Sequence, residues 1–309
     1  MAGPKDLSIR RPVMAGRFYP ADPARCREAA RALIQAAAGF SGVGEPVAAH
    51  FPGRTALGGI VPHAGWMCSG AIAGQVIAEI DRLMCDAPPE LVVVFGAVHT
   101  PIEINRAALD SHEAWQVPGG QSPAAHDLAR KLAGNARFFV PDDRLHRTEH
   151  AVEVELPLIQ SAWPAAMLLP IEVPLIEDAA RIGQETAREV LSSGKRCIFL
   201  ASSDLTHYGP AYRFAPAGTG PQGLQWAKEN DGRLLRLVTD LAVEQVVPEV
   251  RARANACGGG AIAAILAACK EAGAKSATVL RHANSHEMLA GLADNDPANA
   301  VGYAGVVVT

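Results

Sequence analysis

Three histidines each follow a short apolar run of the kind that forms a buried β-strand. His63 follows GGIVP, His99 follows VVVFGAV, and His207 lies just past the run that begins CIFLA. The carboxyl ends of parallel strands meet at one edge of a sheet, where α/β proteins bind their ligands. One histidine in a loop is more often a hydrogen-bonded structural residue than a ligand. Three at one edge instead predict a metal site, because imidazole is the commonest side-chain metal ligand.

A fourth predicted strand, ATVLRH, also ends in a histidine, His282. We expect this strand end to lie with the others. His282 and His286 are four residues apart, a spacing that binds a metal on a helix, but here the pair follows a strand and is a weak signal.

Cys257 is the cysteine best placed to add a third ligand. It stands directly before three glycines that open a predicted helix. The helix dipole stabilises a thiolate there, and thiolate is the form that binds metals. The alternative is a buried, inert thiol at a helix start. The other five cysteines form no CxxC pair and no disulfide pattern, and we expect most of them to be free in a reducing cytosol.

Carboxylates accompany the histidines in two places. Asp204 precedes His207 by three residues, so it could orient the imidazole as a general acid–base, or simply cap the turn after the strand. Glu149 and His150 open the segment EHAVEVELP. A carboxylate at a helix start is favoured by the dipole without any function, but both side chains could also face a pocket.

The composition excludes several classes of protein. With 309 residues, 49% apolar and 19% charged, the chain can bury a large core. A net charge of −4 without a run of Lys or Arg argues against nucleic acid as the main partner. No apolar stretch approaches the ~20 residues of a membrane helix, and the N-terminus has no apolar signal core. We therefore expect a cytoplasmic protein without a membrane partner; a homo-oligomer stays open.

Strand and helix signals alternate along the chain, which predicts an α/β fold with a mostly parallel or mixed sheet flanked by helices. No linker or repeat divides residues 1–309, so we expect a single domain. Strands are expected within residues 55–61, 90–100, 165–173, 197–201, 276–282 and 301–309. Helices are expected over 22–39, 69–84, from Ser122, over 149–163 with an interruption at Pro157, and over 178–191, 224–238 and 258–273, with a loop over 209–223.

Five motifs in this order resemble the Memo-like family: PHAGW, GAVH, EHAVEVELP, SSDLTHYG and NACGGGAI. This family includes the eukaryotic Memo proteins and the bacterial and archaeal AmmeMemoRadiSam system protein B group. GRFYP near the N-terminus and VGYAGVV near the C-terminus also fit, so the resemblance covers almost the whole chain. It implies a fold similar to class III extradiol ring-cleavage dioxygenases, which use non-haem iron(II).

The resemblance also implies roles for particular residues. The metal ligands would be His63, His99 and Cys257. The remaining pocket residues are the Asp–His pair of the SSD..H motif, Asp204 and His207, and the pocket-lining Glu149 and His150.

We therefore expect an oxidoreductase that binds Fe(II), with Cu or Zn as alternatives, and uses O2 on a small chelating, catechol-like substrate. Two other hypotheses stay open. A metal-dependent hydrolase would use Asp204 or Glu149 as base and consume no O2. A non-catalytic metal- or peptide-binding module would show no turnover. Nucleotide-binding and serine-hydrolase motifs are absent from the sequence.

Overall fold

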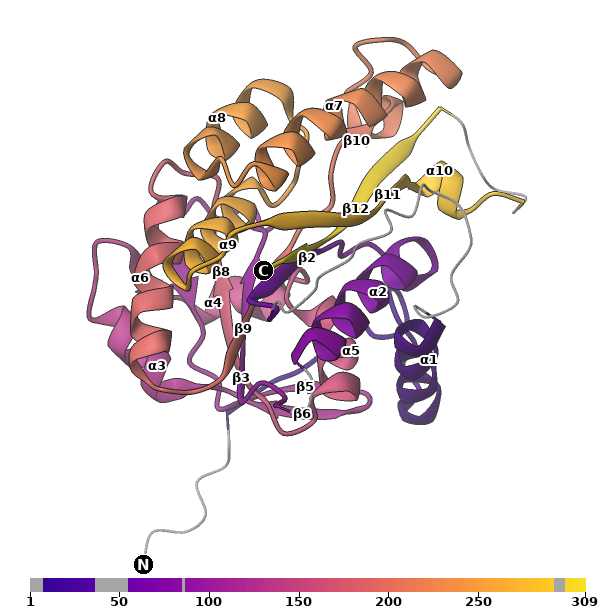
Figure 1. The fold of residues 1–309 in the computed structure, drawn as a ribbon. Coiled ribbons are helices and arrows are strands. Elements are labelled where there is room, and N and C mark those ends of the chain that lie inside the picture. Colours follow the sequence, from indigo (N-terminus) through magenta and orange to yellow (C-terminus); the bar gives the residue numbers. More distant parts are fainter. Residues whose placement is uncertain (1–7, 37–54, 85–86, 292–297) are drawn as a thin grey trace, which may run out of the picture.

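A mixed sheet of nine strands forms the centre of the protein (Figure 1). The computed structural model describes residues 8–36, 55–84, 87–291 and 298–309. The order across the sheet is β10 (His207–Tyr208), β12 (Ala300–Val308), β2 (Gly58–Val61), β9 (Cys197–Ser202), β3 (Leu91–Gly96), β8 (Met167–Glu172), β4 (Ala107–Leu109) and β7 (Phe139–Pro141), with β11 (Ala277–Asn284) beside β12. The four central strands β2, β9, β3 and β8 are parallel, and β12 and β4 pair antiparallel on either side.

Helices cover both faces of this sheet, which confirms the expected α/β class (Figure 1). The core on one face contains α3 (His126–Ala133), α6 (Ala179–Ser192), α7 (Pro221–Thr239), α8 (Val243–Arg253) and α9 (Gly259–Glu271). The core on the other face contains α1 (Pro23–Ala36), α2 (Trp66–Met84) and α5 (Leu156–Ala162). The shorter helices are α4 (Asp143–Thr148) and α10 (Ser285–Met288), with single 3-10 turns at Glu153–Glu155 and Pro210–Tyr212.

Strand β3 is continuously apolar because both of its faces are buried. Leu91, Val93 and Phe95 contribute to the core beneath α6 and α9, and Val92 and Val94 contribute to the core beneath α2 and α5. Successive side chains of a strand point to opposite faces. The strands that carry the site are therefore held from both sides.

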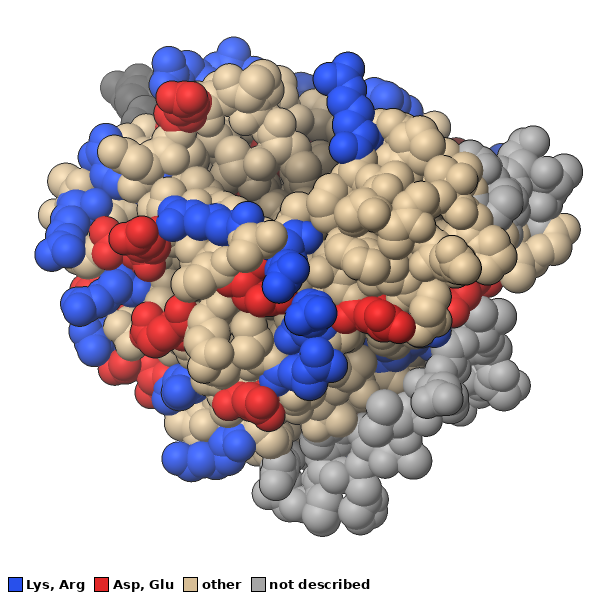
Figure 2. Space-filling view, turned by 90° about the horizontal axis from the view of Figure 1, so that it is seen from above, with Lys and Arg blue, Asp and Glu red and all other residues tan. Residues whose placement is uncertain are grey.

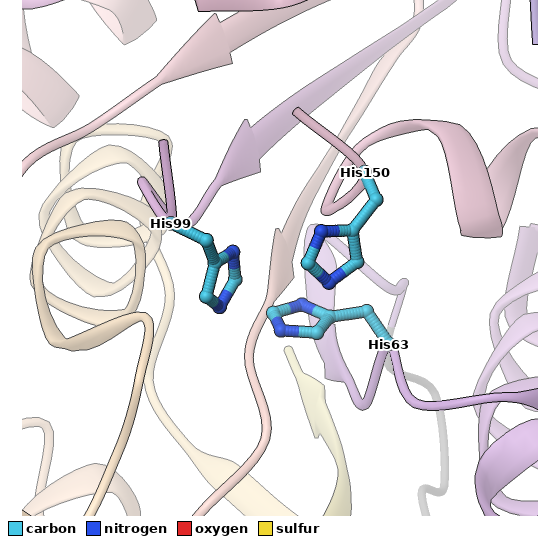
Figure 3. Close-up of side chains that lie close together, drawn as sticks. All are labelled: His63, His99 and His150. Atoms are coloured by element: carbon cyan, nitrogen blue, oxygen red, sulfur yellow. The ribbon is translucent and has the colours of Figure 1, made fainter. Parts of the chain in front are cut away.

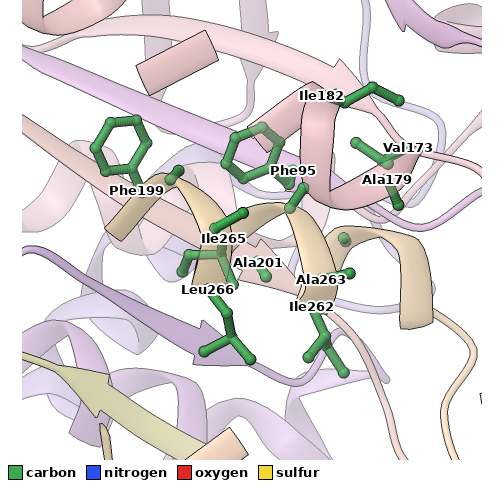
Figure 4. Close-up of a cluster of buried hydrophobic side chains, with 14 of the residues drawn as sticks. Phe95, Val173, Ala179, Ile182, Phe199, Ala201, Ile262, Ala263, Ile265 and Leu266 are labelled. Atoms are coloured by element: carbon green, nitrogen blue, oxygen red, sulfur yellow. The ribbon is translucent and has the colours of Figure 1, made fainter. Parts of the chain in front are cut away.

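The small residues of α9 allow it to pack closely against α6 and the sheet (Figure 4). Gly183 of α6 lies directly against the backbone of Ala264, where a Cβ would have no room. This Ala- and Gly-rich helix therefore packs closely against α6.

The structure corrects several predicted element boundaries. Residues from Ser122 do not start a helix: β6 (Gly120–Pro123) pairs with β5 (Ala114–Val117), and β1 (Ile9–Arg10) completes this small sheet. The next helix starts only at α3, because the strand pairing of residues 120–123 outweighs their local helix-start signal. Pro157 does not interrupt a helix but lies in the first turn of α5, where its missing N–H costs nothing. The predicted loop over 209–223 is shorter, since α7 starts at Pro221.

The surface mixes charges of both signs. Figure 2 shows Lys and Arg side chains interspersed with Asp and Glu on the face seen from above. In the described part of the chain, no helix combines the length and apolar character that spanning a membrane requires.

Candidate metal centre

Three neighbouring parallel strands deliver the predicted site residues to one edge of the sheet. His63 follows β2, His99 follows β3 and Asp204 follows β9. These strands are adjacent in the order β2-β9-β3, so their carboxyl ends lie side by side. His150 reaches the same edge from the segment after α4.

The imidazole rings of His63, His99 and His150 form a compact cluster (Figure 3). Their ring centroids are 5.0 Å apart for His63 and His99, 5.3 Å for His63 and His150, and 4.5 Å for His99 and His150. One nitrogen from each ring lies within 4.8 Å of the others, close enough for one ion to contact all three. The His63 ring is buried, whereas His99 is exposed, so the cluster is open to solvent on one side.

Each ring has its Nδ1 against a protein oxygen. His63 Nδ1 is 2.9 Å from Ser202 Oγ, and Ser202 donates its own proton to the Ala151 carbonyl at 2.6 Å. The His63 ring is therefore the donor in that contact. His99 Nδ1 and His150 Nδ1 lie 2.9 and 3.2 Å from the same oxygen of Glu149. This arrangement leaves the three Nε2 atoms available, as in metal sites whose ligands are oriented from behind.

Glu149 is buried and fully engaged. Its carboxylate accepts the backbone N–H groups of His99, Thr100 and His150, besides the two rings. Burial alone would raise the pKa of Glu149, but the hydrogen bonds from His150 and His99 outweigh it and hold the pKa well below its usual range. Because both oxygens are occupied, the geometry favours orientation of the histidines over proton transfer.

Burial lowers the pKa of His63 to about 3. The ring is therefore neutral at pH 7, and a cation would bind its Nε2 lone pair in place of the contact with the Cys257 thiol.

Cys257, the predicted third ligand, lies beside the histidine cluster but is not among the residues whose ligand atoms all lie within 4.8 Å of one another; His150 takes that place. The Cys257 sulfur is 3.2 Å from His63 Nε2 and 3.3 Å from the backbone nitrogen of Asp204. The sequence left a thiolate and a buried, protonated thiol both open at the start of α9, and the surroundings favour the protonated thiol. Burial, together with the charge of Asp204, raises the pKa of the Cys257 thiol. Metal binding would have to displace this proton.

Asp204 joins the two halves of the site. Its Oδ1 accepts the backbone N–H groups of His63 at 2.9 Å and Ala64 at 3.3 Å, and its Oδ2 lies 3.8 Å from His207 Nε2. That Nε2 is buried and has no hydrogen-bond partner among the described residues. Burial would raise the pKa of Asp204, but the neighbouring His63 and His207 lower it overall, so the carboxylate is ionised. The His207 ring packs against Tyr212, with centroids 5.0 Å apart.

Sequence reasoning missed two contacts of the site. Ser202 accepts a hydrogen bond from the His63 ring, and the signal that could have found it is its place at the start of the SSDLTHYG motif. Phe18, from the GRFYP motif, packs edge-to-face with the His150 ring, and the two ring centroids are 5.3 Å apart. The N-terminal motif therefore forms part of the wall of the site.

His282 does not join the cluster. Strand β12 separates β11 from β2, and the His282 ring instead bonds Asp231 of α7 at 3.0 Å. The periodicity of one strand does not show which strands become neighbours.

A second group of potential ligands consists of Asp110, His112 and Asp143. Asp110 bonds the His112 ring at 2.6 Å and the Trp115 indole at 2.7 Å, and Asp143 accepts from Ser111. These hydrogen bonds explain the group structurally. The described cysteines, Cys257 included, are all free thiols.

Comparison with known proteins identifies the chain. The family model of Memo-like proteins matches residues 10–307. A MEMO1 family protein of Methanococcoides burtonii is 31% identical over 97% of this chain and 100% of its own length, and one of Methanosarcina mazei is 31% identical over 98% and 100%. A MEMO1 family protein of Thermococcus kodakarensis is 30% identical over 97% and 99%. An uncharacterized protein, JW3007 of Escherichia coli K12, superimposes with a TM-score of 0.45 at 12% identity, covering 75% of this chain and 91% of that chain. The sequence matches show that this chain belongs to the Memo-like family.

Proposed function

We propose that this protein is a metal-dependent oxidoreductase that resembles extradiol dioxygenases. Its metal would be iron(II), held by His63, His99 and Cys257, and its substrate a small chelating molecule such as a catechol. The observation that carries the proposal is the set of three imidazoles with oriented Nδ1 atoms and converging ligand nitrogens, with a thiol 3.2 Å from one of them.

The donor set fits a first-row transition metal. Imidazole and thiolate both suit iron, copper and zinc. With three protein ligands, positions stay open for a chelating substrate and for O2, which a bound iron(II) would activate. His150 directs its ring at the same point, so it is placed to contact the ion or a group bound to it.

His207 is placed to move a proton. Its ring is partly exposed and could accept the proton of a substrate hydroxyl, and the ionised Asp204, 3.8 Å from the buried Nε2, would stabilise the imidazolium that results. Glu149 keeps His99 and His150 in place during this step.

Metal analysis after anaerobic reconstitution tests the proposal first. We expect near-stoichiometric iron in the wild type and loss of iron in Cys257→Ala. The control Cys269→Ala, which changes a thiol on α9 buried in the hydrophobic core, should retain its iron. A wild type that binds no metal would refute the proposal.

O2 uptake with a panel of catechols tests the reaction. Substrate-dependent O2 consumption supports an oxygenase. Turnover without O2 consumption would instead support the hydrolase hypothesis. A metal-loaded protein without any turnover, whose partner binding survives His207→Gln, would support a non-catalytic module.

A further inference from the structure

The contact between His282 and Asp231 leads to a second layer of the site. Asp231 is buried, and its two oxygens have different partners: Oδ2 bonds the His282 ring at 3.0 Å and Oδ1 accepts the backbone N–H of Thr206 at 2.9 Å. Gly302 of β12 lies against this carboxylate, where a Cβ would have no room. Only glycine therefore fits at position 302 of β12 beside the Asp231 carboxylate.

Thr206 sits between Asp204 and His207, the two residues proposed to handle protons. Its hydroxyl accepts from Asn230 Nδ2 at 3.2 Å, and its carbonyl accepts from Gly302 N at 2.9 Å. With the bond to Asp231, every polar group of this fully buried residue is engaged. The conformation of the loop that carries Asp204 and His207 is thus fixed largely through Thr206.

Asn230 also reaches the segment that leads to Cys257. Its Nδ2 donates to the carbonyl of Arg253 at 3.0 Å, and its own backbone carbonyl accepts from Asn255 Nδ2 at 3.0 Å. Cys257 N in turn donates to the carbonyl of Asp204 at 3.2 Å. One turn of α7 therefore contacts both chain segments that approach the metal centre on this side.

We infer that Asn230 and Asp231 are positioning residues that fix the Asp204–His207 loop and the Cys257 segment relative to each other. This inference rests on the proposed metal centre. Neither side chain contacts the predicted ligands, so the pair acts through Thr206 and the backbone of residues 253–257. Outer-layer partners of metal ligands commonly change metal affinity by about 10- to 100-fold.

Cobalt(II) is a suitable probe, because a bound thiolate gives a sulfur-to-cobalt charge-transfer band that reports on Cys257. We expect Asp231→Ala and Asn230→Ala to weaken Co²⁺ binding about tenfold and to shift or weaken this band. Asp231→Asn keeps an acceptor for Thr206 N and should restore most of both properties. The control Thr186→Ala removes a buried hydroxyl on α6 that bonds only Ile182; it should lower the melting temperature without changing affinity or band.

Two outcomes would overturn the inference. If Asn230→Ala and the folded Asp231 variants lower the melting temperature but keep wild-type Co²⁺ affinity and spectrum, the pair is only structural. If wild-type protein itself shows no thiolate band, the proposed metal centre fails and the positioning role fails with it. Should Asp231→Ala not fold, Asn230→Ala and Asp231→Asn carry the test.

Discussion

The two sides of the metal centre differ in how completely their hydrogen bonds are made. On one side, the Glu149 carboxylate accepts from two rings and four backbone N–H groups, and His99 and His150 are fixed by it. On the other side, the Asp204–His207 contact is 3.8 Å long and His207 Nε2 has no hydrogen-bond partner in the described structure. The hydrogen bonds of Glu149 fix the orientation of His99 and His150. The looser Asp204–His207 contact leaves His207 free to take up a proton.

The largest effect, on O2-dependent turnover, is expected from replacing His207 on the second side of the centre. His207→Gln should leave metal content unchanged, because the ring is not a predicted ligand, and should lower O2-dependent turnover by roughly 10²- to 10⁴-fold. Metal analysis combined with an oxygen electrode measures both. The control Tyr212→Phe keeps the ring that packs on His207 and should retain most activity. Unchanged turnover in His207→Gln would remove its proposed role.

A smaller effect, on metal affinity, is expected from replacing Glu149 on the first side of the centre. Glu149→Gln loses the charge that orients His99 and His150, so metal affinity should fall by about 10- to 100-fold. A competition titration with a chromophoric chelator measures the affinity. Glu103→Gln, an exposed change in the segment after His99, should have no effect. Equal affinity in Glu149→Gln and Glu103→Gln would contradict the difference between the two sides.

Ser202→Ala tests the uncharged hydrogen bond between Ser202 Oγ and the His63 ring. His63 loses its Nδ1 acceptor, but an uncharged hydrogen bond contributes only about 1 kcal/mol, so affinity should fall about fivefold. The same titration measures it. A loss as large as that in Glu149→Gln would show that charge is not what distinguishes the two supports.

Two buried carboxyls lie behind the centre, one on each side. Glu172 is close to Glu149 and Glu155 is close to Asp204, and none of their oxygens has a hydrogen-bond partner among the described residues. Burial, helped by the neighbouring carboxylate in each case, raises both pKa values well above the usual range. The native state then keeps a proton that the unfolded chain loses above pH 4.5.

The free energy of unfolding should therefore fall as the pH rises from about 4.5 towards the raised pKa values, by roughly 1.4 kcal/mol per carboxyl for each pH unit in that interval. Glu172→Gln and Glu155→Gln remove this loss, so their melting temperatures relative to wild type should rise between pH 5 and pH 8. The exposed change Glu177→Gln should show no such trend. A pH-independent difference for both buried variants would mean that these carboxyls are not held protonated.

The sequence predicted the residues of the site better than their environment. His63 and His99 lie at neighbouring strand ends as expected, because apolar runs and their polar ends are local signals. The third ring of the cluster is His150 rather than His207, which begins β10. The sequence could not decide between a thiolate and a buried thiol at Cys257, because its pKa depends on burial and on Asp204, 53 residues away in the chain. The hairpin formed by residues 114–123 was missed because Ser122 and Pro123 also fit the start of a helix.

By itself, the sequence determined the alternation of strands and helices, and hence a sheet whose edge collects histidines and carboxylates. Only the tertiary structure decided which oxygen holds each imidazole, which carboxylate is ionised, and that α7 contacts both loops of the site. The physical reason is range. Side-chain periodicity and turn chemistry act over a few residues. Hydrogen bonds such as those that Glu149 accepts from His99 or Asp231 accepts from His282 join positions about fifty residues apart, and packing alone brings them together.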